Sequence, residues 1–233
     1  AAFRIPGAPR RARTNRGAEG IVRYFAPAHH FKGLHFRSYA PGIFPPVIRE
    51  EIREASPSVG EHFTVYLPAY GLELLEEVLQ KISNVSWEVF HPSCKRSWSR
   101  GVVTFRPIDQ DNFLHSFLHC QGILTSAGFE TPAEALYLGK KLLVVPIRRQ
   151  YEQSLNAAAL AELGIPVLHS LKGRSIQLLR KWVYSPQPDR VLSPHHLPET
   201  LREILKERED LASSGWDVPQ SSDPKVSPGF INS

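Results

Sequence analysis

The feature that most constrains the fold is an alternation, between residues 62 and 164, of short β-rich runs with longer amphipathic runs. Strands are expected at His62–Leu67, Ser86–Phe90, Val102–Phe105, Gly122–Thr125 and Lys141–Pro146. Apolar spacings of three and four predict helices at Leu72–Ile82, Asn112–Cys120, Thr131–Gly139, Tyr151–Gly164, Ser175–Val183 and Leu197–Glu209. Strands separated by helices cannot be joined by hairpins. The pattern therefore predicts an α/β fold with a doubly wound, mostly parallel sheet.

Composition places the chain among ordinary globular proteins, since 42% of its 233 residues are hydrophobic and 22% are charged. No apolar run approaches the roughly 20 residues that a membrane-spanning helix needs, and the N-terminal residues lack the apolar centre of a secretory signal. A cytoplasmic protein is expected, with peripheral contact to the inner membrane face left open. Cys94 and Cys120 lack the spacing of a zinc site, so packed thiols and no metal are expected.

Charge and proline divide the chain into three parts. Residues 1–38 are expected to be a basic arm, in which six arginines before residue 24 face only Glu19, with 21–37 as the remnant of a preceding domain. Residues 39–209 are expected to form the main domain, which a proline-rich linker introduces, and 210–233 a disordered tail. A basic arm can contact nucleic acid or an anionic membrane. A solvated end is favoured instead, so no specific nucleic-acid partner is expected.

The segment Thr125–Ala135 (TSAGFETPAEA) is the richest candidate site, because it runs from a strand through Gly128 directly into a helix. Ligands of open parallel sheets bind at the carboxyl ends of the strands. Glycine lets the backbone approach a ligand closely, and the unpaired amides at a helix start favour a phosphate. The segment therefore predicts a phosphorylated ligand.

Glu134 has two interpretations that the sequence leaves open. Thr131-x-x-Glu134 is a capping box, in which Glu134 would reach back to the start of its own helix. Alternatively, the two oxygens of this carboxylate could accept hydrogen bonds from both ribose hydroxyls of a nucleotide.

A second polar cluster lies at the start of the next helix, after the strand that Pro146 ends. Glu152, Gln153 and Asn156 could read the hydroxyls of a sugar there, or could simply be polar residues of a helix start. Arg148 and Arg149 could offset phosphate charge or remain solvated.

Together, the two clusters resemble the C-terminal nucleotide-binding domain of GT-B glycosyltransferases. The closest groups are the UDP-glycosyltransferases and the bacterial transferase that adds N-acetylglucosamine to lipid-linked peptidoglycan precursors. Their pattern is His-Cys-Gly-Trp-Asn-Ser-x-x-Glu, followed by an acidic residue with Gln. Here Ser126–Glu134 (SAGFETPAE) keeps the Gly-to-Glu spacing, and Glu152-Gln153 supplies the later pair.

The resemblance implies one half of a GT-B architecture that transfers a hexose-type sugar from a nucleotide, with a UDP-sugar as donor. By this resemblance Glu134 binds the ribose, Glu152 and Gln153 contact the donor sugar, and no metal or other cofactor takes part. The diphosphate would be held by Ser126, Gly128, Phe129 and Thr131. The base would be bordered by Arg106, Pro107 and Ile108.

Departures from the family pattern also carry expectations. Ser126 stands where the family has a phosphate-facing His, and Glu130 puts an acid beside the expected diphosphate. No Glu follows eight residues after Glu130 or Glu134, so the paired-glutamate signature of many retaining enzymes is absent and an inverting transfer is expected.

The catalytic base remains unassigned by the sequence, because in GT-B enzymes it usually lies on the N-terminal domain. His29, His30 and His35 are weak candidates. The chain is therefore expected to bind a nucleotide sugar but to turn it over poorly by itself. Other readings stay open: an enzyme that epimerises UDP-N-acetylglucosamine, an anion- or nucleic-acid-binding module led by the basic arm, and a degenerate domain that only contacts partners.

Overall fold

The computed structural model describes residues 33–40 and 42–190, together with 17, 20, 201, 202, 205 and 206. The chain divides into two compact units, Ala1–His196 and Leu197–Ser233, and the features below belong to the first. Of the expected helix Leu197–Glu209, the four residues described are helical. The basic residues before Gly17, His29 and His30, and the expected tail 210–233 lie outside the described residues. The predicted boundaries after residues 38 and 209 stay predictions.

A six-stranded sheet forms the centre of the first unit, in the order β5-β6-β4-β3-β7-β8. Its strands are β3 (His62–Tyr66), β4 (Ser86–Phe90), β5 (Trp98–Arg100), β6 (Val103–Arg106), β7 (Gly122–Thr125) and β8 (Lys141–Val144). All neighbouring pairs run parallel except β5 with β6. The strand order reverses between β3 and β7, which is the doubly wound arrangement that the sequence predicts.

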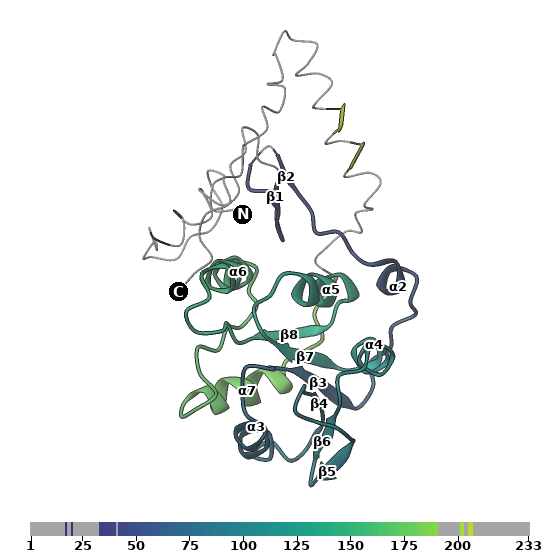
Figure 1. Ribbon diagram of the computed structural model, residues 1–233, viewed down its shortest axis with the longest axis vertical. Helices are drawn as coiled ribbons and strands as arrows, with labels where there is room; N and C mark the ends of the chain where they lie inside the picture. The colour runs from purple at the N-terminus through teal and green to yellow at the C-terminus, as the bar shows by residue number, and fades with distance from the viewer. Residues whose placement is uncertain are drawn as a thin grey trace, which may run out of the picture. The chain divides into compact units, whose positions relative to one another are not determined.

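Helices cover both faces of this sheet (Figure 1). On one face lie α3 (Leu72–Leu79) and α7 (Ser175–Val183), and on the other α4 (Gln110–His119), α5 (Glu130–Leu138) and α6 (Tyr151–Glu162). Two apolar cores follow: Leu75 and Trp182 pack in the first, and Phe117 and Leu160 in the second. The α/β prediction is therefore confirmed. Helix α5 stops at Gly139, whose φ of 68° is the left-handed cap that glycine favours.

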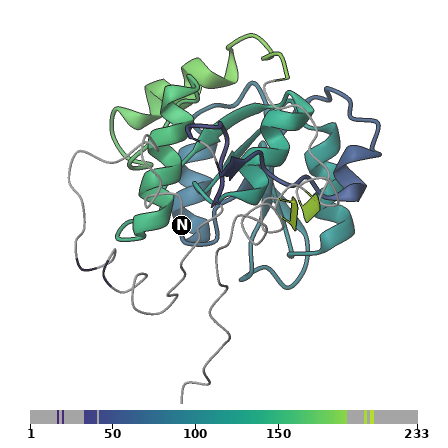
Figure 2. The same ribbon diagram turned by 90° about the horizontal axis from the view of Figure 1, so that it is seen from above.

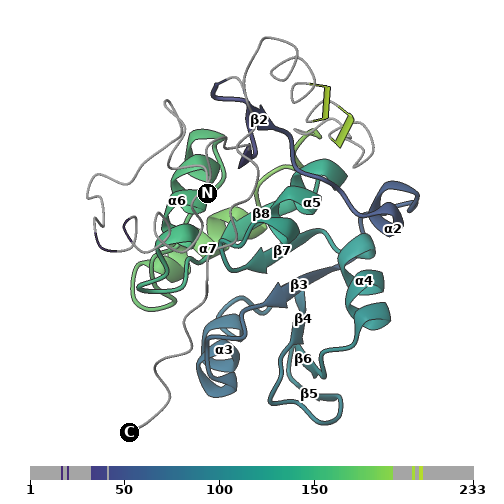
Figure 3. The ribbon, with the colours of Figure 1, turned by 45° about the horizontal axis from the view of Figure 1, so that its top comes forward.

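The segment expected to be a linker is packed against the domain instead. It carries β1 (Gly33–Leu34) paired in parallel with β2 (Ile43–Phe44), and then α2 (Glu50–Arg53). Residues 33–40 and 42–53, called the strap below, run across the layer of α5 and α6 (Figure 2) and end beside α4 (Figure 3). Phe36, Ile48 and Ile52 are buried in the core beneath α4, α5 and α6. Apolar burial thus holds the strap in place.

The short strand β5 was not predicted. It contributes three residues, none of them buried, and returns through Gly101 in a left-handed conformation. A run this short carries too little alternation to be recognised from sequence.

Both cysteines are buried and free, as predicted, and burial raises the pKa of each thiol. Within the described part of the chain, no helix combines the length and apolar character needed to cross a membrane.

Lys140 donates hydrogen bonds to carbonyl groups at the C-terminal end of α4. Its buried Nζ donates to the carbonyl oxygens of Ser58, Leu118 and Cys120 at 2.5, 2.7 and 2.8 Å. The last carbonyls of a helix have no partner within the helix, and a cation there also complements the helix dipole. This single ammonium therefore ties α4 to the segment that precedes β3.

We predict that Lys140→Met lowers the free energy of unfolding by about 2–4 kcal/mol, because three carbonyls lose a charged donor at once. Urea unfolding measures the effect. The control is Lys95→Met, at an exposed lysine of a loop, which should change stability by less than about 0.5 kcal/mol. Equal effects of the two substitutions would contradict the structural role of Lys140.

Candidate functional site

The loops that follow the parallel strands meet at one edge of the sheet and are tied to one another. His91, which follows β4, is 4% exposed, and its Nδ1 accepts a hydrogen bond from the Ser93 amide at 3.1 Å. Its Nε2 must therefore carry the proton and donates to the Tyr70 carbonyl at 2.9 Å. The His91 amide in turn donates to the Arg106 carbonyl at 3.1 Å. His91 thus links the loops after β3 and β4 through its ring and the end of β6 through its backbone amide.

The turn from β7 into α5 is open to an approaching ligand. A Cβ atom added at Gly128 would meet only the Ser126 hydroxyl oxygen, at 4.0 Å, so the glycine is not required by contacts within the chain. The N-cap residue Phe129 makes no side-chain capping hydrogen bond to the first amides of α5. Ser126 and Thr131 are partly exposed, and the Phe129 ring packs on Phe36 of the strap at 4.9 Å between centroids. These residues leave an unblocked helix start, which suits an anion.

Glu134 lies one turn into α5 and is 3% exposed. Its carboxylate accepts two hydrogen bonds from Arg49 of the strap, from Nε at 2.6 Å and from Nη2 at 3.0 Å. The hydrogen bond to Glu134 raises the pKa of Arg49. The arginine remains 43% exposed, so one side of the pair reaches solvent.

This geometry excludes the capping box for Glu134. Helix α5 begins at Glu130 with Phe129 as its N-cap residue, so Thr131 lies inside the helix and is not its N-cap. The carboxylate is paired across the fold instead, with a residue that the sequence placed in a linker. Nothing local in the sequence points to Arg49 as its partner.

The start of α6 is joined to both neighbouring loops. Gln153 accepts a hydrogen bond at its Oε1 from the Ile147 amide at 2.9 Å. The buried Asn156 donates from Nδ2 to the Ala127 carbonyl at 3.2 Å. Glu152 is exposed. The two predicted clusters are thus brought together, because Asn156 of the second holds the backbone of the first.

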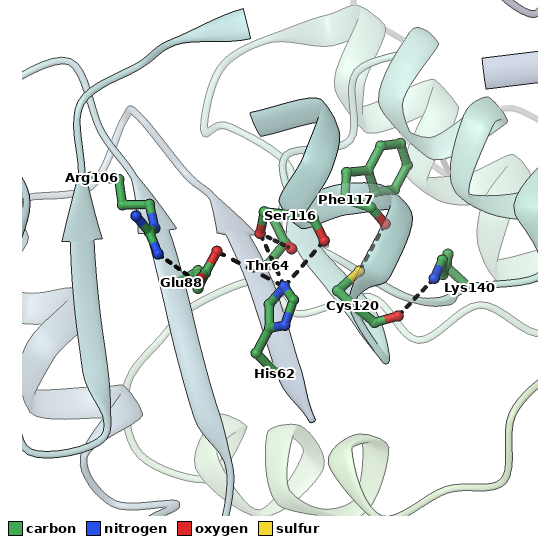
Figure 4. Close-up of polar contacts among 8 residues, drawn as sticks. All are labelled: His62, Thr64, Glu88, Arg106, Ser116, Phe117, Cys120 and Lys140. Atoms are coloured by element: carbon green, nitrogen blue, oxygen red, sulfur yellow. Dashed lines mark hydrogen bonds and ion pairs between the residues drawn. The ribbon is translucent and has the colours of Figure 1, made fainter. Parts of the chain in front are cut away.

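The loop after β6 is held at both ends. The Arg106 guanidinium donates to Glu88 of β4 at 2.8 Å (Figure 4), and Asp109 caps α4 by accepting from the Asn112 amide at 2.9 Å. Although burial opposes it, hydrogen bonds from Arg106 and Ser116 lower the pKa of Glu88. Between these anchors Pro107 is partly exposed, and the Ile108 side chain is 48% exposed. The Arg106 side chain therefore points toward the neighbouring strand β4. The loop backbone and the Ile108 side chain remain at the edge of the sheet.

A serine, a histidine and a glutamate also meet beneath α4, as Figure 4 shows. The Ser116 hydroxyl lies 3.1 Å from His62 Nε2, and Glu88 lies 3.9 Å from the same nitrogen. A nucleophilic triad needs the serine and the acid on opposite ring nitrogens. Ser116 is also only 2% exposed, so this group is a structural contact between α4 and the sheet.

Two further sequence expectations concern histidine and metal. His35 is 3% exposed, accepts from the Phe36 amide at Nδ1, and has a pKa lowered by burial. Such a ring packs within the strap and does not face solvent. Among the described residues, no group of three His, Cys, Asp or Glu side chains is placed to hold a metal ion.

Fold and site define a Rossmann-like domain with a ligand edge at its topological switch point. A family model described as glycosyl transferase family 1 matches residues 17–185, and the chain belongs to this family. The family that the two motifs predicted, and the Rossmann-like half of a GT-B architecture, are thereby confirmed. No curated protein sequence matches the chain.

The chain is similar to solved glycosyltransferases at low identity. VinC, in complex with DTDP, is 18% identical with a TM-score of 0.48, over 79% of this chain and 50% of that one. The spinosyn rhamnosyltransferase SpnG is 14% identical with a TM-score of 0.49, over 78% and 53%. UGT89C1 of Arabidopsis thaliana, complexed with UDP-L-rhamnose, is 16% identical with a TM-score of 0.45, over 74% and 48%. The chain spans about half the length of these structures.

We predict that a double-mutant cycle of Arg49→Ala and Glu134→Ala gives a coupling free energy of about 1–3 kcal/mol, because either single change leaves a charge that the fold had paired. Urea unfolding of the four proteins measures it. The exposed pair Arg100–Glu76, at 2.9 Å, is the matched control and should couple by less than about 1 kcal/mol. A coupling at positions 49 and 134 no larger than in the control would refute a tight pair.

Proposed function

We propose that this chain binds the nucleoside-diphosphate sugar donor of a glycosyl transfer, with a UDP-sugar as donor and an acceptor still to be identified. The observation that carries the proposal is the β7–α5 turn, where Gly128 is open and the N-cap residue Phe129 makes no side-chain capping hydrogen bond. Family membership supports transferase chemistry, of hexosyltransferase type. In the proposal, Ser126, Phe129 and Thr131 join Gly128 in holding the diphosphate by amides and hydroxyls.

The nucleoside would lie across the switch point of the sheet. Glu134 is proposed to accept hydrogen bonds from both ribose hydroxyls. The backbone of Arg106 and Pro107 would border the base, and the exposed Ile108 offers it an apolar contact. This placement is supported by the loop after β6, which is anchored by Glu88 and by the cap at Asp109.

The donor sugar is proposed to lie at the start of α6. Gln153 already uses its oxygen on the Ile147 amide, so its NH₂ group remains as a donor to sugar hydroxyls. Glu152 is exposed and provides acceptors. Asn156 supports the arrangement by holding Ala127, next to the proposed diphosphate site.

In this proposal the transfer inverts the anomeric centre. A base deprotonates the acceptor hydroxyl while the sugar leaves its diphosphate, and the amides at the start of α5 stabilise the charge that grows on the leaving group. No metal is invoked, because the helix start and its dipole supply this stabilisation. The residues described here provide the donor side of the reaction, and the base is not assigned to any of them.

Arg49 must move for the ribose to bind in this way. An arginine that donates from Nε and Nη2 uses one lone pair on each of the two carboxylate oxygens. The two hydroxyls of a vicinal diol would donate to the same positions. The guanidinium and the ribose hydroxyls therefore compete for Glu134. The partly exposed arginine can withdraw toward solvent, while the buried carboxylate cannot.

Titration calorimetry with UDP, dTDP and GDP tests the site. We predict that UDP binds best and that Glu134→Ala weakens its binding by about 1–3 kcal/mol, or roughly 5- to 150-fold, because the ribose hydroxyls lose their acceptor. Glu130→Ala, an exposed acid at the start of the same helix, is the control and should leave affinity equal or higher. Absence of nucleotide binding at millimolar concentration would refute the proposed function.

A second prediction concerns Arg49. Removing a competitor should raise affinity, so Arg49→Ala is expected to bind UDP several-fold more tightly than the unchanged chain. The same substitution should not improve binding of a 2′,3′-dideoxy nucleoside diphosphate, which lacks the diol. Calorimetry of both ligands measures the difference. Weaker UDP binding by Arg49→Ala would mean that the arginine orients the carboxylate and does not compete.

A further inference from the structure

A cavity of about 920 Å³ opens at the carboxyl edge of the sheet, between α6, the loop after β8 and the segment that leads into α7. Its volume is in the range of small-molecule sites. None of the residues proposed above to hold the diphosphate, the ribose or the base lines it. The cavity is therefore distinct from the proposed diphosphate, ribose and base sites, and it borders the proposed donor-sugar site, because Ile147 and Ser154 line it next to Gln153.

The walls of this cavity are partly apolar, and Tyr70, Ser154 and Ser170 add polar groups to them. Leu74 of α3 and Leu171 close two sides, and α6 presents Ala157, Ala158 and Ala161 to the interior. Ala161 lies one helical turn after Ala157 and Ala158, so the three share one side of α6. Because their side chains are small, the helix leaves room for a ligand rather than filling the space with its own atoms.

The rim of the cavity carries cations and no acid. Arg148, Arg149 and Lys172 line it, His169 adds a ring nitrogen, and no lining residue is Asp or Glu. All four side chains are exposed, and none makes an ion pair within the described part of the chain. The charge of Lys172 is partly offset by the nearby Glu77, whereas the guanidinium groups of Arg148 and Arg149 suit phosphate oxygens.

The backbone at Arg149 supports a functional origin for this charge. Ile147–Gln150 form a turn closed by the Gln150 amide and the Ile147 carbonyl at 3.2 Å, and Arg149 occupies its third position with a φ of 67°. That position favours Gly or Asn, because a Cβ is strained there. An arginine at this point places its charge at the rim, although its left-handed backbone destabilises the turn.

We propose that this cavity binds a phosphorylated amphiphile, with its phosphate on the cationic rim and its apolar body between α6 and Leu171. The apolar part of the walls matches the apolar body of such a ligand, and the cationic rim matches its phosphate. A role for this ligand as the acceptor of the transfer rests on the function proposed above, but the binding itself does not.

The experiment is calorimetric titration of the full chain with octyl phosphate below its micellar concentration, beside inorganic phosphate and 1-octanol. Octyl phosphate is expected to bind at least tenfold more tightly than either fragment. Ala158→Phe, which fills the cavity without changing a charge, should weaken it at least fivefold. Glu134→Ala should leave it unchanged, so that this proposal and the nucleotide site can fail independently.

Arg149→Gly provides the sharpest variant, since a structural and a functional role predict different results. Glycine relieves the left-handed backbone, so the melting temperature should stay equal or rise, while octyl phosphate affinity should fall at least fivefold. Arg96→Gln, at an exposed arginine outside the cavity, is the matched control and should change neither.

Several outcomes would overturn the proposal. Equal affinity for octyl phosphate and inorganic phosphate would mean that the rim only attracts anions. Displacement of octyl phosphate by UDP would assign the cavity to the nucleotide site. Binding to phosphatidylglycerol vesicles without binding to monomeric octyl phosphate would indicate a membrane-facing surface. Unchanged affinity in both Ala158→Phe and Arg149→Gly would place the ligand elsewhere.

Discussion

The parallel pairing of β3 with β7 is the constraint on which the site depends. The chain leaves β3 toward α3 on one face and leaves β7 toward α5 on the other, so the loops that follow them diverge at the switch point, where ligands of open parallel sheets bind. Hydrogen bonds through His91 and Asn156 then hold the surrounding loops. The sheet thus fixes where a ligand can bind before any ligand chemistry is considered.

Glu134 is a buried carboxylate that depends on a paired cation. A carboxylate that is 3% exposed is costly unless it is paired, and Arg49 provides the pairing in the absence of a ligand. The same carboxylate is the acceptor proposed for the ribose. An arginine that alternates with a diol would keep the carboxylate hydrogen-bonded in both states, at a cost in affinity for the nucleotide.

Local patterns predicted the sheet and its helices because buried runs carry their own periodicity. The bounds of β4, β7 and α7 coincide with the predicted ranges. The pairing of Arg49 with Glu134 could not be predicted, since the two residues are 85 positions apart and meet only through the tertiary fold. The cationic rim of the cavity could not be predicted for the same reason. Arg148 and Arg149 lie in one loop, whereas His169 and Lys172 come from a later segment.

The strap contacts α5 and its N-cap residue at two points. Phe36 packs on Phe129, and Arg49 donates hydrogen bonds to Glu134. A ligand that takes Glu134 from Arg49 loosens the second of these, so strap docking and ligand occupancy share one coupling free energy. Such coupling is reciprocal. Any partner that pulls the strap away from α5 would favour the bound nucleotide by the same factor by which the nucleotide favours release of the strap.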